Sequence, residues 1–342
     1  MPMNKNLKYF LISLLILIIA IILYFIIKFI IFYFNAKKAL YNALTNSKYC
    51  GKEDCDPTPS QLIQTLPESI NINIWQQDVA KYCINIIYSI KIAALNKTKP
   101  VYPKDLIAVK ELYDNKNDPI FGTIFTQSNE DNNIWISFRG SLTSNEWKED
   151  FIMKQESLFQ TPRNIKQVQL DFLTTSTGEI ANVHKGFVDI YTNFRNDLLS
   201  TIQQINPDKN KLIVISGHSI GAAVATLVGV DLAQSGYTNI VVYTFACPRI
   251  GDNTFKTIVD DTLKLPVYRV VNISDLIPNS PLSVQPNLND TTNPYMYLHC
   301  GFLIPFQINR LSINGNHGIP AYMAGLENKL VAIDRFPTDL KK

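Results

Sequence analysis

The pentapeptide GHSIG, at residues 217–221, holds a serine hydroxyl that could act as a nucleophile. The apolar run LIVIS precedes it and the small-residue run AAVATLVGV follows it, so the sequence predicts a strand at 211–216 and a helix at 222–235. A tight turn between them lifts the hydroxyl of Ser219 above the sheet edge, beside the free N–H groups of a helix start. The alternative interpretation is an ordinary serine in a glycine-bounded turn.

A nucleophilic serine needs a base, and the chain contains four histidines. His218 lies inside the turn, where its backbone position directs its side chain away from the serine hydroxyl. In this type of site the order along the chain is serine, acid, histidine, which excludes His184 and leaves His299 and His317. The glycines on both sides of His317 favour a loop there. We therefore predict that His317 is the base and that the other three histidines are structural.

The acid is expected at the end of a strand between the serine and the histidine. The segment VVNISDLIP fits, because an apolar strand runs directly into Asp275 and Pro278 then stops it. A carboxylate at this position would hold the tautomer of His317 and stabilise its charged form. Three other aspartates are alternatives that we place in turns or helices facing solvent: Asp252, Asp260 and Asp261.

Strands and helices alternate along the chain, which predicts an α/β fold with a mostly parallel central sheet. The predicted strands lie at 121–127, 134–138, 211–216, 239–246 and 266–273, and the predicted helices at 72–95, 184–205 and 222–235. We expect three parts: an anchor at 1–34, a polar linker at 35–71, and one catalytic domain at 72–342.

The anchor is predicted from an uninterrupted apolar run, Tyr9–Ile27. Nineteen helical residues span roughly 28 Å, about the thickness of a bilayer core. A signal peptide would have a shorter apolar region, and a buried core helix would show a polar stripe. The sequence therefore predicts a single-pass transmembrane helix preceding the α/β domain.

The positive charges that orient such an anchor are nearly balanced, because lysines flank both ends of the run. The free amino terminus favours an inside N-terminus and a lumenal or extracellular catalytic domain. In that compartment Cys50 and Cys55 could oxidise, and the sequons at Asn96 and Asn289 could be glycosylated. Asn272 should stay unmodified, because we place it in a buried strand.

The net charge of +3 is spread over the chain, which argues against a nucleic-acid partner. The five cysteines are scattered and form neither a disulfide framework nor a usual zinc pattern. We expect no metal and no cofactor.

Seven motifs follow one another as they do in the class 3, or fungal-type, lipases of the α/β-hydrolase superfamily, which residues 100–325 resemble. They are FRGS (138–141), HKGF (184–187), GHSIG, PRIGD (248–252), VVNISDLIP, YLHCG and NHGIPAY. The resemblance implies the same triad of Ser219, Asp275 and His317. It also implies that Ser141 and the N–H of Ile220 form the oxyanion hole, and that Trp147 belongs to a lid.

The expected function is that of a membrane-anchored serine ester hydrolase of class EC 3.1.1 that works through an acyl-enzyme. Its substrates would be lipid esters at a membrane or lipid surface, as for a triacylglycerol lipase or a related acylglycerol or phospholipid lipase. A peptidase on the same fold is a weaker alternative. The alternative from another class is a non-catalytic lipid-binding or scaffold protein.

Overall fold

The computed structural model describes residues 23–28, 66–115, 118–128, 133–142, 167–285, 287 and 292–327. Residues 23–28 are a helical segment of a unit separate from the rest. Within these described ranges no helix has the length and hydropathy that a membrane span requires. Most of the predicted anchor and linker lies outside the described residues, as do Cys50, Cys55, Trp147 and Asn289.

A seven-stranded sheet, in the order β1-β2-β3-β6-β7-β8-β11, forms the centre of the larger unit. Its strands are β1 (Leu106–Leu112), β2 (Gly122–Gln127), β3 (Ile134–Phe138), β6 (Ile213–His218), β7 (Ile240–Phe245), β8 (Val267–Asn272) and β11 (Phe302–Phe306). From β3 onward neighbouring strands are parallel, while β1 and β2 pair antiparallel. The predicted α/β fold with a mostly parallel sheet is confirmed.

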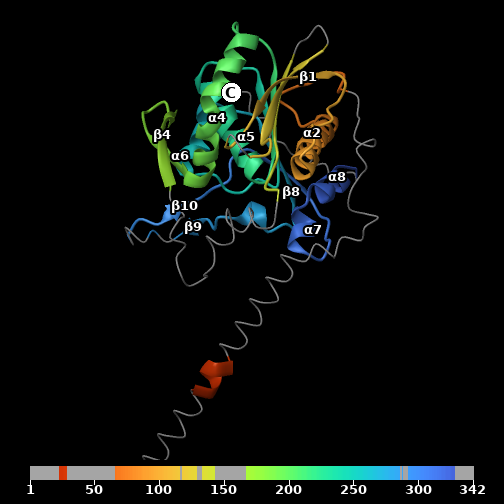
Figure 1. The fold of residues 1–342 in the computed structure, drawn as a ribbon. Coiled ribbons are helices and arrows are strands. Elements are labelled where there is room, and N and C mark those ends of the chain that lie inside the picture. Colours follow the sequence, from red (N-terminus) through yellow and green to blue (C-terminus); the bar gives the residue numbers. More distant parts are fainter. Residues whose placement is uncertain are drawn as a thin grey trace, which may run out of the picture. The chain divides into compact units, whose positions relative to one another are not determined.

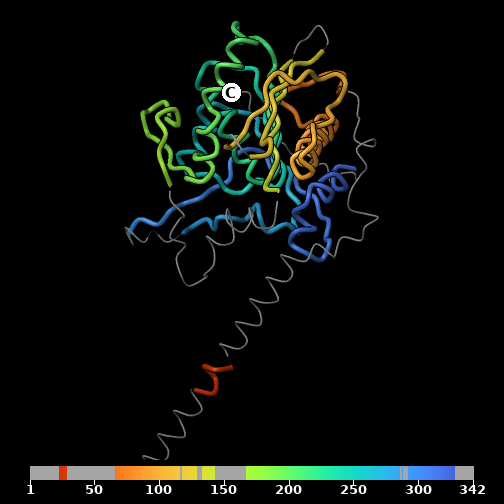
Figure 2. Tube along the Cα trace, viewed as in Figure 1, coloured from red at the N-terminus to blue at the C-terminus, as the bar shows by residue number. Residues whose placement is uncertain are grey.

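Helices cover both faces of this sheet (Figure 1). On one face α2 (Gln77–Asn96) packs against the strands and against α8 (Ile319–Glu327). On the other face α5 (Ile220–Gln234) lies between the sheet and α4 (Lys185–Ile205), which explains why α5 is buried on nearly every side. In Figure 2 the orange trace of α2 runs beside the blue trace of α8, so distant parts of the sequence meet here.

Short elements complete the unit at the ends of the strands. Two ribbons form, one from β4 (Gln167–Thr174) and β5 (Ile180–His184), the other from β9 (Val284–Gln285) and β10 (Tyr295–Met296). The remaining helical turns are α6 (Asn253–Thr257), η5 (Ile258–Thr262), η6 (Ile277–Asn279) and α7 (Ile313–His317). Both η6 and α7 follow strands at their carboxyl ends, where the predicted site residues also lie.

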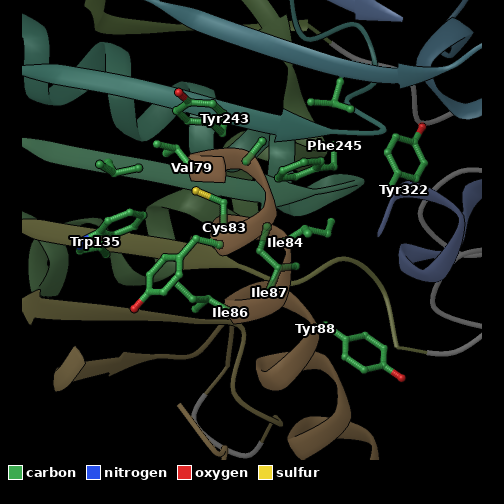
Figure 3. Packing of buried hydrophobic residues seen from close by; sticks show 14 of the residues in the cluster. Val79, Cys83, Ile84, Ile86, Ile87, Tyr88, Trp135, Tyr243, Phe245 and Tyr322 are labelled. Carbon is green, nitrogen blue, oxygen red and sulfur yellow. The ribbon is translucent and has the colours of Figure 1, made fainter. Parts of the chain in front are cut away.

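The apolar side of α2 forms the main core on its face of the sheet (Figure 3). Cys83, Ile86 and Ile87 are fully buried there, and the ring of Tyr82 meets that of Trp135 with centroids 4.9 Å apart. Leu66 and Ile70, which the prediction assigned to the linker, also pack against this cluster.

Three differences from the predicted elements have physical reasons. The helix predicted from Ile72 begins at Gln77, because the Gln76 side chain accepts from the N–H of Asn71 and donates to the carbonyl of Ser69, which holds an irregular turn. Strand β11 was missed because its sequence FLIPF contains proline, which is tolerated because β11 is an edge strand of the sheet as described. Strands β1, β4 and β5 were missed because they are partly exposed.

Candidate active site

Ser219 occupies a strained turn between β6 and α5. Its backbone has φ 57° and ψ −124°, a conformation that only a tightly determined environment maintains in a residue other than glycine. A Cβ atom on Gly217 would lie 2.1 Å from the carbonyl oxygen of Gly221, and one on Gly221 would lie 2.2 Å from that of Arg139. Both glycines are therefore required by close backbone approach, as a nucleophile elbow demands.

Three predicted residues from distant parts of the chain are joined by hydrogen bonds at this turn. The Nε2 atom of His317 lies 2.8 Å from Oγ of Ser219, and its Nδ1 atom lies 2.8 Å from Oδ2 of Asp275. Because a carboxylate only accepts, Nδ1 carries the proton and Nε2 is left to accept from the serine hydroxyl. The Asp275 side chain is fully buried and that of His317 is 10% exposed.

The carboxylate of Asp275 is held by two further donors besides the histidine. The N–H of Ile277 donates to Oδ1 at 2.9 Å, and the hydroxyl of Tyr322 donates to Oδ2 at 2.7 Å. Burial, together with the adjacent carboxylate, raises the pKa of Tyr322 well above its usual value, so its hydroxyl stays protonated. Our sequence reasoning gave Tyr322 no role, although it lies in the quoted motif NHGIPAY.

Two buried asparagine side chains tie the loop of the acid to the loop of the base. Asn272, at the end of β8, donates to the carbonyls of Ile308 and Asn316 at 2.8 and 3.0 Å. Asn316 in turn donates to the carbonyl of Ser274 at 3.0 Å and accepts from the N–H of Arg310. Sequence reasoning missed this pair, because an asparagine in a loop has no pattern that reveals its partners. The expected burial of Asn272 is confirmed.

The residues predicted for the oxyanion hole border the same turn. Ile220 is the first residue of α5, so its N–H has no acceptor within the helix. The Oγ atom of Ser141 is buried and has no hydrogen-bond partner. Ser141 follows Gly140, where an added Cβ would lie 3.0 Å from that of Ser219. A buried hydroxyl without a partner is costly and is typical of a place where a ligand atom binds.

The remaining histidines have contacts of their own. His184 caps α4 by accepting from the N–H of Gly186 at 3.1 Å, and its ring stacks on Phe187. His299 bonds to the backbone of Pro278, and burial, with Arg269 and Arg249 nearby, lowers its pKa to about 3. His218 donates to the main chain of His317.

The alternative acids are engaged elsewhere. Asp252 caps α6 and also accepts from Asn182, while Asp260 pairs with Lys256 and accepts from the N–H of Gly301. Our prediction that all three face solvent is therefore wrong for these two, which are partly buried, and holds for Asp261, which is exposed.

Metal ligands and thiols do not form a cluster in the described part of the chain. No group of three or more histidine, cysteine, aspartate and glutamate side chains is arranged there to hold a metal ion. Cys83, Cys247 and Cys300 are buried and free.

A mostly parallel sheet with helices on both faces, and a serine on a strained strand-to-helix turn, are the features of the α/β-hydrolase fold. In a comparison with known proteins, residues 135–285, a little under half of the chain, match the family model described as Lipase (class 3). The resemblance predicted from the motifs is confirmed.

Individual relatives are similar over part of their length. Phospholipase A1-IIalpha of Arabidopsis thaliana is 26% identical over 219 residues, which cover 56% of this chain and 48% of that protein. A lipase of Rhizomucor miehei is 32% identical over 155 residues, which cover 43% of this chain and 37% of that protein. The chain thus spans about half the length of these curated relatives or less.

Two solved structures support the fold. A triacylglycerol lipase whose catalytic centre is described as a serine protease triad aligns with a TM-score of 0.52 and 23% identity, covering 70% of this chain and 84% of that one. Lipase II from Rhizopus niveus aligns with a TM-score of 0.50 and 20% identity, covering 67% of this chain and 81% of that one.

Proposed function

We propose that this protein is a carboxylic ester hydrolase that cleaves acylglycerols or phospholipids through an acyl-enzyme on Ser219. One observation carries the proposal: the unbroken hydrogen-bonded chain from the Ser219 hydroxyl through His317 to the buried Asp275. Three residues separated by 42 to 98 positions in sequence meet in the order that proton transfer from a serine requires.

In the proposed reaction, Nε2 of His317 takes the proton of Ser219 as its oxygen attacks the ester carbonyl. The Asp275 carboxylate stabilises the imidazolium, which then gives the same proton to the leaving alcohol. Water attacks the acyl-enzyme, His317 again removes a proton, and the carboxylic acid leaves as the serine is reprotonated. The negative charge on the carbonyl oxygen would be stabilised by Ser141 and by the N–H of Ile220.

The proposed substrate class rests on the relatives, whose names include both phospholipase A1 and lipase. We infer that the substrate is a lipid ester, either an acylglycerol or a phospholipid. Hydrolysis of a triacylglycerol and of a phospholipid with distinguishable acyl chains, compared at equal surface concentration, would assign the preferred head group and position.

The test of catalysis compares the full-length protein in detergent with its Ser219→Ala and Ser141→Ala variants. Ser219→Ala should abolish ester hydrolysis. Ser141→Ala should lower kcat by roughly 10²-fold, or by less because its backbone N–H remains. Lipid binding without turnover in the wild-type protein would instead support the alternative, a non-catalytic lipid-binding or scaffold protein.

We further propose that residues 1–34 anchor the domain to a membrane, with the domain lumenal or extracellular. The support is the apolar run Tyr9–Ile27, whose last five residues lie in the helical segment described at 23–28. Anchoring would keep the site at the surface where water-insoluble esters accumulate. The protein should resist extraction by alkaline carbonate, and complete release would rule the anchor out. Protection of the domain from protease in sealed microsomes would show that it lies on the lumenal side of the membrane, and digestion without detergent would show the opposite orientation.

The proposed lid around Trp147 predicts higher activity on aggregated esters than on dissolved ones. A rate that rises smoothly through the solubility limit of the ester would argue for a permanently open site.

A further inference from the structure

His218, the residue before the nucleophile, contacts the proposed base at its main chain. Its Nε2 atom lies 2.8 Å from the carbonyl oxygen of His317. A carbonyl oxygen only accepts, so Nε2 must carry the proton of His218 and Nδ1 must be bare. That Nδ1 is buried, has no hydrogen-bond partner, and faces Gly140, where an added Cβ would lie 2.8 Å away. The contact therefore fixes the tautomer of His218.

The carbonyl that His218 binds needs a donor. His317 is the last residue of α7, a helix of one turn, and the final carbonyls of a helix have no partner within it. His317 itself is 8% exposed and His218 1% exposed, so water is largely excluded from this carbonyl. Without His218, this buried carbonyl would lose the hydrogen bond that ties the proposed catalytic base to the residue before the nucleophile.

The two adjacent residues His218 and Ser219 thus hold His317 at two points. Ser219 meets the ring at Nε2, and His218 meets the backbone carbonyl of the same residue. The rings of the two histidines are also in contact, with centroids 4.8 Å apart and planes tilted by 42°. Because His218 ends β6 and Ser219 directly follows it, a shift of this segment moves nucleophile and base together.

We propose that His218 is a positioning residue that sets the Ser219–His317 distance by holding the main chain of His317. This inference rests on the proposed function, in which that distance governs proton transfer.

The charge of His218 matters as well, because a cation beside His317 would oppose formation of the imidazolium. The groups around it are His317, Lys91 and Tyr322, with Asp275 beyond His317. Burial lowers the pKa of His218 well below its usual value, and the proximity of His317 and Lys91 adds to the effect. His218 thus donates as a neutral ring at neutral pH.

The mutational test compares two substitutions of His218 in the full-length protein. Glutamine can place an N–H near the position of Nε2, whereas leucine cannot donate. His218→Leu should lower kcat on a soluble ester about tenfold or more, with KM changed less than about twofold, since loss of the hydrogen bond to the His317 carbonyl displaces the base and does not touch substrate binding. His218→Gln should restore kcat to within about threefold of wild type.

His299→Leu is the matched control, because it also removes a histidine bonded to a backbone carbonyl but lies outside the proposed machinery. Its kcat should stay unchanged. Equal losses in His218→Leu and His218→Gln, or unchanged kcat in both, would overturn the positioning role. Ser219→Ala, assayed in parallel, separates the two proposals: if it retains hydrolysis, the proposed function itself fails.

A measurement on the wild-type protein does not depend on the folding of any variant. Nitrogen-15 NMR of histidine-labelled protein in detergent should show His218 protonated at Nε2 only, with shifts constant from pH 5 to pH 9. A resonance of His218 that titrates in this range, or a proton on Nδ1, would contradict the inference.

Discussion

The α2 core and the candidate site lie on the same sheet and are held together in different ways. In the core, aliphatic and aromatic side chains of α2 pack against β3 and β7 (Figure 3). Such apolar contacts do not depend on a particular bond direction. At the strand ends, the positions of Ser219, Asp275 and His317 depend on hydrogen bonds of defined geometry. The core should therefore tolerate substitutions by apolar side chains of similar volume, whereas the site should tolerate almost no substitution.

The backbone shows the same contrast. Helix α2 is regular and ends with Lys97 in a left-handed cap, a common way to stop a helix. Around the site, both Ser219 and Ala246 have positive φ, and the N–H of Ser219 binds the carbonyl of Phe245. Apolar burial stabilises the molecule as a whole, and part of that stability maintains the strained turn.

Tyr322 belongs to both regions. Its ring packs in the α2 core, nearly perpendicular to that of Phe306 with centroids 5.1 Å apart, and its hydroxyl donates to Asp275. Substitutions in the site, in the core and at Tyr322 can show whether catalysis and stability change independently.

The largest effect is expected at the base. His317→Ala should lower kcat by roughly 10⁴-fold or more, because triad members act as a unit. The thermal unfolding midpoint, measured on the same preparation, should lie above the assay temperature, so that the loss of kcat is not a loss of folded protein. His299→Ala is the control and should retain activity. Loss of activity in His299→Ala with activity retained in His317→Ala would mean that the base is misassigned.

A change in the core should have the reverse signature. Ile87→Ala should lower the free energy of unfolding by about 2–5 kcal/mol, because Ile87 is fully buried and its loss leaves a cavity. Well below the midpoint of unfolding, kcat should equal that of wild type. Denaturant titration and kinetics on one preparation would measure both. A proportional fall in kcat would show that the two regions are coupled.

Removal of the Tyr322 hydroxyl should have a smaller effect. Tyr322→Phe keeps the ring in the core but takes one donor from the carboxylate, so kcat should fall about tenfold, which is 1.4 kcal/mol. Tyr82→Phe is the control, because the Tyr82 hydroxyl is buried in the α2 core without a partner. It should leave kcat unchanged. Identical kinetics in the two variants would remove Tyr322 from the site.

The smallest effect at neutral pH is expected at His299, whose contribution to stability changes only toward acid pH. The pKa of His299 is about 3 in the folded protein and near 6.5 when unfolded. Below pH 6.5 the unfolded chain takes up a proton that the folded one does not, so stability falls toward pH 3 by about 1.4 kcal/mol per pH unit. His299→Gln should lose this part of the slope and match wild type above pH 7. The same dependence of the free energy of unfolding on pH in wild type and in His299→Gln would contradict this prediction.

The buried strands and helices were predictable because their side chains repeat a simple pattern. Strand β3 was placed at its observed bounds, and β6 and α5 to within two residues, since both are continuously apolar. Strand ends and chain order then brought Asp275 and His317 to Ser219. Partners of isolated polar residues could not be predicted: the contacts of Tyr322, Asn272 and Asn316 depend on how loops from distant parts of the sequence meet.

The most direct test of the account is covalent labelling of the nucleophile. The full-length protein would be treated with a fluorophosphonate, digested and mapped by mass spectrometry, with Ser219→Ala alongside. A serine activated by His317 reacts and forms one stable adduct. We predict a single adduct on Ser219, loss of hydrolysis in step with labelling, and no adduct in the variant. An adduct on another residue, or hydrolysis that survives complete labelling of Ser219, would contradict the account.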